Sequence, residues 1–237
     1  VSSVASKLSS EVATAAKRAI NEKGVFNLAI PGGSILKMLE STSSDISWTS
    51  NTRIVYVNHK AVANDDINLS THAKAKAGFL GAWIENGCSV LTMDGTSDAH
   101  GEATSYRGKL EALDLPLNKG GFPVFDMMLI GVGDDGHVGS LYPGREEVLN
   151  ERDWVLPVSM KSPGSITLSL PLMTAAKKVI VAAGGTSEKY PLGKSAGMKR
   201  AIEGAETLSS FPAAGLRGKA TWIIDEAAGS ELSDMYK

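Results

Sequence analysis

The chain has 237 residues, of which 43% are hydrophobic and 21% charged, a composition typical of a globular protein long enough to bury one large core. Its formal net charge of -2 leaves no basic excess to neutralise a phosphate backbone, so no nucleic-acid partner is expected. No apolar run reaches the roughly 18 residues that a membrane span needs.

The first part of the chain predicts a helix, a short strand and a second helix. Residues 1–23 are predicted to be helical because apolar side chains recur at helical spacing, at Val4, Leu8, Val12, Ala15 and Ala19. The apolar run 26–30 predicts a strand that ends in the glycine turn 31–34. The spacing of the apolar residues that follow predicts a helix over 35–39.

The middle of the chain continues this alternation. The apolar run 53–57 (RIVYV) predicts a second strand, and residues 73–83 are predicted to be helical. A short strand is predicted over 89–93, followed by a helix over 101–113.

The clearest strand candidate lies in the second half of the chain. Residues 125–131 (FDMMLIG) form an apolar run that leads into a second glycine turn. Further strands are predicted over 165–170, 178–183 and 220–224, and helices over 192–202 and from about Asp225.

Strands that alternate with helices are typical of an α/β fold with a mostly parallel central sheet flanked by helices. No segment has the composition of a linker, and neither repeats nor low-complexity segments are present. We therefore interpret residues 1–237 as a single domain of Rossmann-like type.

The first glycine turn is Pro31-Gly32-Gly33-Ser34. In an open parallel sheet, ligands bind at the carboxyl ends of the strands, where this turn is expected. Glycines permit a close backbone approach, and N–H groups at a helix start favour an anion such as phosphate. The alternative interpretation is a plain strand-to-helix turn in which Ser34 caps the helix.

The second glycine turn, residues 131–144, carries two acids and a histidine. His137 is a candidate general base because imidazole titrates near neutral pH. Asp135 is a candidate either to orient the imidazole or to bind a sugar hydroxyl, and Gly136 lies between them. The alternative is a polar turn whose histidine only packs or faces water.

Other reactive side chains give weaker signals. His59 and His72 follow the second strand, where a site can form, whereas His100 lies in a polar stretch. No HxxxH or HExxH pattern occurs, so neither a metal nor another cofactor is expected. Cys88 is the only cysteine, which excludes an internal disulfide, and we interpret it as structural.

The second turn carries a resemblance to a known family. Residues 125–144 resemble the 6-phosphogluconolactonase signature, roughly FDxxLLGxGxDGHxASLFPG. Related isomerases and deaminases share GxGxDGH but continue toward FNEP, whereas this chain continues GSLYPG. Further similar segments, in the family's order, are 31–34, 166–171, 212–214, 221–225 and 227–228.

The resemblance implies the sugar-phosphate isomerase/lactonase type of α/β fold. It also implies hydrolysis of 6-phosphoglucono-δ-lactone, in the oxidative pentose phosphate pathway, without a metal. By resemblance His137 is the general base, assisted by Asp135. The turn Gly32-Gly33-Ser34 holds the 6-phosphate, with Gly136, Lys60 and Lys189 as further substrate-binding residues.

Several positions depart from the family's pattern. Asn58-His59-Lys60 stands where Asp-Glu-Arg is usual, which removes two carboxylates and replaces a guanidinium with an ammonium. Asn68-Leu69-Ser70 replaces Asp-Ser-Asn, and Ser165 replaces an arginine. Glu188 stands where a phosphate-binding lysine is expected, with Lys189 one residue later.

These departures leave three hypotheses open. The leading one is a hydrolase that acts on a small-molecule sugar phosphate. The second is a catalytically weakened or inactive relative that serves as a structural or regulatory subunit of a larger assembly. The third is another sugar-phosphate enzyme, such as a glucosamine-6-phosphate deaminase. The expected compartment is the cytoplasm or the plastid stroma, and any targeting peptide lies outside this sequence.

Overall fold

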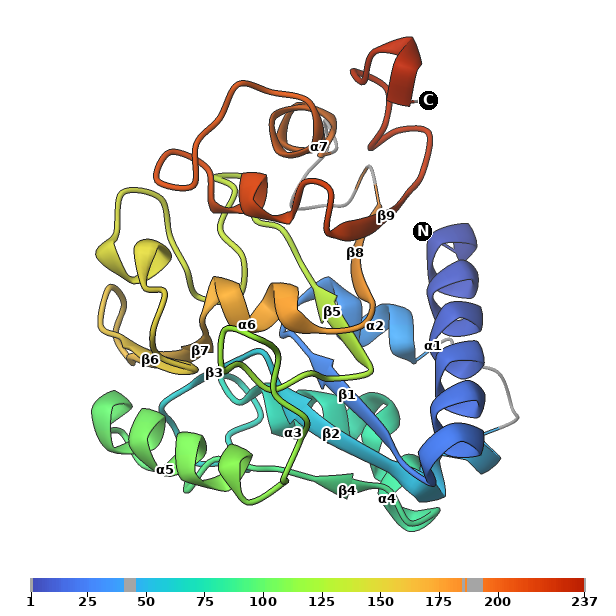
Figure 1. Cartoon of the computed structure of the whole chain (residues 1–237), viewed down its shortest axis with the longest axis vertical. Coiled ribbons are helices and arrows are strands. Elements are labelled where there is room, and N and C mark those ends of the chain that lie inside the picture. Colours follow the sequence, from blue (N-terminus) through green and yellow to red (C-terminus); the bar gives the residue numbers. More distant parts are fainter. Residues whose placement is uncertain (1, 41–45, 185, 187–193, 237) are drawn as a thin grey trace.

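A six-stranded parallel sheet forms the centre of the molecule (Figure 1). The computed structural model describes residues 2–40, 46–184, 186 and 194–236. The strand order is β4-β2-β1-β5-β8-β9. In chain order the strands are β1 (Phe26–Ile30), β2 (Thr52–Tyr56), β4 (Ser89–Val90), β5 (Met127–Ile130), β8 (Val179–Ala183) and β9 (Ala220–Ile224). All pairings are parallel, so the carboxyl ends share one edge.

A second, antiparallel sheet consists of β3 (Asn58–Lys60), β7 (Ser165–Leu168) and β6 (Val155–Val158). The Leu168 amide donates to the Val57 carbonyl at 2.8 Å, which places this sheet beside the exit of β2. The predicted strand 165–170 is confirmed in its position, but it belongs to this smaller sheet and not to the parallel one.

Helices cover the sheet. They are α1 (Ser2–Lys23), α2 (Ser34–Leu39), α3 (Thr71–Ala75), α4 (Gly81–Glu85), α5 (Ala99–Glu111), α6 (Leu170–Ala175) and α7 (Ser195–Ile202). A π-helical turn, Lys76–Leu80, joins α3 to α4, and 3-10 turns span Ser47–Asn51, Glu146–Leu149, Pro212–Leu216 and Asp234–Tyr236. The α/β class with a mostly parallel central sheet is therefore confirmed.

The core lies between the sheet and its helices. Every residue of β1, β5 and β8 is buried, as expected for strands covered on both faces. The apolar residues of α1 that predicted the helix are buried, and α1 contacts β1, β8 and β9. Figure 1 shows α1 beside the sheet and α5 below the smaller sheet, whose strands β6 and β7 it contacts.

The predicted helix from Asp225 is wrong. After β9 the described chain forms turns and then the short 3-10 segment Asp234–Tyr236. The Asp225 carboxylate accepts a hydrogen bond from the Ala228 amide at 2.8 Å, and this local bond competes with helical pairing.

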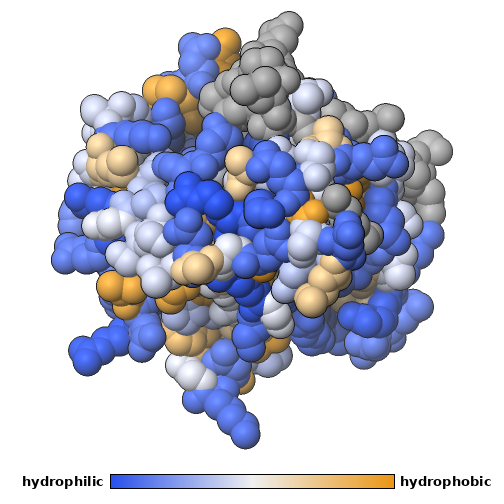
Figure 2. All heavy atoms as spheres, turned by 90° about the horizontal axis from the view of Figure 1, so that it is seen from above, coloured by the Kyte–Doolittle hydropathy of each residue, from blue (hydrophilic) through white to orange (hydrophobic). Residues whose placement is uncertain are grey.

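In the view of Figure 2, hydrophilic side chains predominate on the surface and apolar ones form small separate areas. Within the described ranges, every helix is too short or too polar to cross a membrane.

Candidate active site

The two glycine turns meet at the carboxyl edge of the sheet. From β1 the chain proceeds outward through β2 to β4 on one side, while β5, β8 and β9 lie on the other. Ligands of open α/β sheets bind in the crevice where the strand order reverses, which here is outside the ends of β1 and β5. Residues 31–34 follow β1 and residues 131–144 follow β5, so both turns lie at this crevice.

His137 and Asp135 form a hydrogen-bonded pair in the second turn. The imidazole Nδ1 lies 2.6 Å from Asp135 Oδ1, and the His137 amide donates to the same oxygen at 3.1 Å. An ionised carboxylate only accepts hydrogen bonds, so Nδ1 carries the proton and Nε2 keeps its lone pair. The His137 side chain is 32% exposed, which leaves it accessible to a substrate.

The charge on Asp135 is maintained by the same contacts. Partial burial acts to raise the pKa of this carboxyl, but the hydrogen bonds from the His137 amide and imidazole outweigh burial and lower the pKa overall. A charged Asp135 fixes the tautomer of His137, because only the Nδ1–H form can donate to it.

The aromatic ring of Tyr142 packs against the His137 imidazole. The Tyr142 ring centroid lies 4.9 Å from that of His137, with the planes tilted by 39°. Sequence reasoning does not single out Tyr142, because its ring reaches the His137 imidazole only when the turn folds back on itself.

Three glycines shape this turn, each for a different reason. A Cβ on Gly133 would lie 2.1 Å from the His137 imidazole. Gly136 has φ +82°, and a Cβ there would lie 2.3 Å from the Phe211 ring. Gly139 has φ +59°, and its Cβ would lie 2.6 Å from Thr167 Oγ1. Larger residues would therefore displace the base or the segments that support it.

Asn58 links the two turns. Its Oδ1 accepts from the Gly32 amide at 3.4 Å, and its Nδ2 donates to Ser140 Oγ at 3.4 Å. Ser140 is held in turn by its amide, which donates to Thr167 Oγ1 at 3.1 Å. The sequence indicates only that Asn58 replaces a carboxylate of the family's pattern. In the structure its side-chain amide bridges the two turns by accepting one hydrogen bond and donating another. An ionised carboxylate has no donor and could not make the bond to Ser140 Oγ in the same way.

The first turn presents an open backbone. Gly33 has φ +85°, and Ser34, which begins α2, is exposed. The helix is preceded by Gly33 with no side-chain cap, so the alternative in which Ser34 caps the helix is wrong. Gly32 lies beside Thr71, whose Oγ1 would be 3.2 Å from a Cβ at this position.

Lys60 and Ser165 are directly paired across β3 and β7. In the same register Asn58 pairs with Thr167, and side chains two residues apart on a strand share a face. Since Asn58 and Thr167 contact the second turn through Ser140, Lys60 and Ser165 lie on the face that is turned toward the site. Lys60 and Ser165, which both depart from the family's pattern, are therefore direct neighbours on this face.

The predicted contact Lys189 lies outside the described residues, as do Gly185, Ser187 and Glu188. A cation that the sequence did not single out reaches the second turn from another direction. Lys194, immediately before α7, donates from Nζ to the Val132 carbonyl at 3.0 Å.

His59 and His72 have structural surroundings. His59 is fully buried; its Nδ1 donates to the Lys60 carbonyl at 2.7 Å, and its Nε2 accepts from the His72 amide at 3.1 Å. Burial lowers the pKa of His59, which favours the neutral ring that these bonds require. His72 Nδ1 lies 2.7 Å from the Tyr56 hydroxyl. Both ring nitrogens of His59 are thus engaged, so His59 is not available as a base.

Cys88 is buried, and burial raises the pKa of its thiol to about 12, which agrees with a structural role. Among the described residues, no group of three or more His, Cys, Asp or Glu side chains could hold a metal ion.

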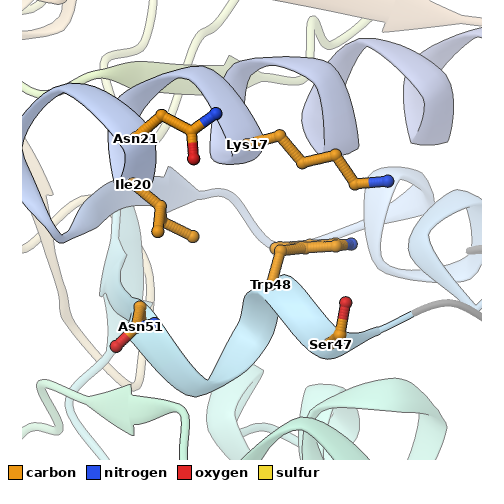
Figure 3. A pocket seen from close by; sticks show the side chains of 6 residues that line it. All are labelled: Lys17, Ile20, Asn21, Ser47, Trp48 and Asn51. Carbon is orange, nitrogen blue, oxygen red and sulfur yellow. The ribbon is translucent and has the colours of Figure 1, made fainter.

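The depression in Figure 3 is distinct from the site. It has a volume of about 320 Å³ and lies between α1 and the 3-10 turn 47–51, with Lys17 and Trp48 facing it. Because this turn leads into the amino end of β2, the depression lies toward the sheet edge opposite the glycine turns.

Comparisons with known proteins agree with this arrangement. The family model described as "Glucosamine-6-phosphate isomerases/6-phosphogluconolactonase" matches residues 1–224. The chain is similar to the 6-phosphogluconolactonase of Rattus norvegicus, with 31% identity over 89% of this chain and 82% of that protein. It is also similar to "Probable 6-phosphogluconolactonase 3, chloroplastic" of Oryza sativa subsp. indica, with 27% identity over 98% of this chain and 74% of that one.

Solved structures show the same fold. The 6-phosphogluconolactonase structure from Leishmania guyanensis superposes with a TM-score of 0.78 at 21% identity, covering 98% of this chain and 96% of that one. The structure from Trypanosoma brucei gives a TM-score of 0.77 at 22% identity, covering 98% and 95%.

Proposed function

The chain belongs to the glucosamine-6-phosphate isomerase/6-phosphogluconolactonase family, and on this premise we propose that it hydrolyses 6-phosphoglucono-δ-lactone to 6-phosphogluconate. The observation that carries the proposal is the Asp135–His137 pair, held at the strand-order reversal with its Nε2 free to accept a proton. Ester hydrolysis near neutral pH needs such a base.

In the proposed reaction His137 Nε2 removes a proton from water while the water oxygen attacks the lactone carbonyl. The tetrahedral intermediate then expels the ring oxygen, and the imidazolium returns the proton to that oxygen as the hydroxyl forms. Asp135 stabilises the transient imidazolium through its 2.6 Å contact with Nδ1. Atoms and charges balance with water as the only co-reactant.

The 6-phosphate is proposed to bind at Gly32, Gly33 and Ser34, where the backbone is open and the Ser34 side chain is exposed. Gly136 brings the second turn close to the substrate. Lys60, on the face of β3 that is turned toward the site, and Lys189 are proposed to supply positive charge.

The test is lactone decay. The lactone is generated from glucose 6-phosphate by a dehydrogenase, and its disappearance is compared with spontaneous hydrolysis. We expect the protein to accelerate decay and His137→Ala to lose activity by at least about a hundredfold, the usual contribution of a general base. His100→Ala, on the exposed start of α5, serves as the matched control and should retain activity.

Other outcomes identify the alternatives. Full activity in a folded His137→Ala protein would show that the base is wrongly assigned. A wild-type protein that neither accelerates decay nor gains thermal stability from 6-phosphogluconate, but copurifies with other chains, would favour the non-catalytic subunit. Ammonia released from glucosamine 6-phosphate would indicate a deaminase.

The names of similar proteins bear on the compartment of this protein. One similar protein is named chloroplastic. We propose the plastid stroma or the cytoplasm, and a fluorescent fusion of the protein located in any other compartment would refute this.

A further inference from the structure

Lys161 lies beside the site although nothing in the sequence singled it out. It belongs to the loop that joins β6 to β7, and it is exposed. Its Nζ is 4.4 Å from the centroid of the Tyr142 ring, which is itself 4.9 Å from the His137 ring. A cation over an aromatic face is attracted by the ring, so Tyr142 holds the ammonium near the base.

The base of this loop is fixed in place. The Ala61 amide donates to the Gly164 carbonyl at 2.8 Å, and Ser165 pairs with both Lys60 and Val158. The loop therefore leaves the antiparallel sheet at the end where Lys60 lies. Ser165, which stands where the family's pattern has an arginine, provides no charge there.

The Lys161 ammonium also lacks an acidic partner. Its Nζ contacts the Tyr142 ring, and no carboxylate within the described ranges forms an ion pair with it. Asp135, an acid of the second turn, is engaged with His137. A ligand anion is thus the natural partner for this charge.

We propose that Lys161, together with Lys60, supplies positive charge to the substrate phosphate that the turn Gly32-Gly33-Ser34 binds, where Ser165 supplies none. The inference rests on the proposed function, because the phosphate is the only charged group of the lactone substrate. The lactone ring is neutral, so an unpaired cation near His137 can distinguish phosphorylated from unphosphorylated lactone.

The experiment compares Lys161→Gln and Lys161→Arg with wild type. For Lys161→Gln we expect KM for the lactone and Kd for 6-phosphogluconate to rise about tenfold, as for a lost charge-assisted contact. The kcat value should stay within about twofold, because the contact is equal in the ground and transition states. Lys161→Arg should retain most of the affinity, and inorganic phosphate should inhibit Lys161→Gln more weakly than wild type.

Lys219→Gln is the matched control. It removes the same charge from an exposed lysine just before β9, at the opposite edge of the sheet, and should leave KM unchanged. Equal KM and Kd in Lys161→Gln and the control would overturn the inference, as would a fall in kcat with KM unchanged.

The two proposals fail differently. A wild-type protein that binds 6-phosphogluconate without hydrolysing the lactone refutes the proposed function, whereas Kd still decides the role of Lys161. A wild-type protein that binds neither 6-phosphogluconate nor phosphate overturns both.

Discussion

Burial gives two imidazoles of this chain opposite roles. His137 is partly exposed and uses Nδ1 for Asp135, so Nε2 is left for chemistry. His59 is fully buried, and both of its nitrogens are satisfied by the backbone of its own neighbourhood. The same side chain is thus a candidate base at one place and a structural element at the other.

His59 should make stability depend on pH. Its folded pKa is lowered below the ordinary 6.5, so its contribution is complete above about pH 6.5 and is lost as the pH falls below that value. Protonation would place an N–H against the His72 amide, which is also a donor. We expect the free energy of unfolding in urea to decline from pH 7.5 to pH 5 and to decline less in His59→Gln.

His72 also contributes to the pH dependence of stability, and its contribution must be distinguished from that of His59. Burial also lowers the pKa of His72, so part of the slope should persist in His59→Gln and shrink further in the double variant His59→Gln/His72→Gln. The same slope in wild type and in both variants would contradict the assignment.

Single residues of the site were predictable only where the contact is local. His137 and Asp135 are two residues apart, so their pairing follows from one turn. Asn58 contacts Ser140, and Lys161 contacts Tyr142, only because β3, β7 and their loops fold onto the second turn. No local pattern encodes such contacts, so sequence reasoning missed them.

At the scale of an element, the space around each position of the second turn determines whether a residue larger than glycine can be accommodated there. Gly133 and Gly131 lie two residues apart, and neither has a left-handed φ. A Cβ on Gly133 would meet the His137 ring at 2.1 Å, whereas a Cβ on Gly131 would meet no atom within 4 Å. The two positions therefore form a matched pair.

Gly133→Ala should displace the His137 side chain and reduce kcat by at least about tenfold, since a misplaced catalytic group is costly. Because imidazole can rotate away, the free energy of unfolding should fall by only about 1 kcal/mol. Lactone assays and urea unfolding measure the two effects. Gly131→Ala should resemble wild type in both, and similar activity in the two variants would refute the steric argument.

Elements were predictable where an apolar pattern is long enough. The strands β1, β5 and β8 are buried runs of four or five residues, and α1 has a clear helical periodicity. The strand β3 was missed because Asn58-His59-Lys60 is polar and owes its conformation to pairing with β7. Its identity as a strand is a tertiary effect.

At the scale of the whole molecule, the candidate site lies at the carboxyl ends of the parallel strands, and a buried charged cluster lies at their amino ends. Asp126 directly precedes β5 and is almost fully buried. Lys23 Nζ, at the end of α1, lies 2.8 Å from its carboxylate, and Lys177 Nζ lies 3.1 Å from it. The Asn27 amide donates to it at 2.9 Å, so one side chain joins α1, β1, β5 and the approach to β8.

Asp126→Asn should lower the free energy of unfolding by about 3 kcal/mol at pH 7, because it removes one partner of a buried charged cluster. Burial acts to raise the pKa of Asp126, but Lys23, Asn27 and Lys177 lower it overall below the ordinary 3.8. The carboxylate's contribution is therefore complete above about pH 3.8 and is lost as the pH falls through the folded pKa. The difference between variant and wild type should shrink accordingly in acid.

Urea unfolding at pH 7, 5 and 3 measures this difference, with Glu151→Gln as the control because Glu151 is an exposed acid. Lactone hydrolysis by folded Asp126→Asn should equal that of wild type, since the cluster precedes the strands and the site follows them. Equal stability of Asp126→Asn and wild type at pH 7 would show that the cluster does not hold the elements together. A loss of kcat with normal folding would show that the two edges of the sheet are coupled.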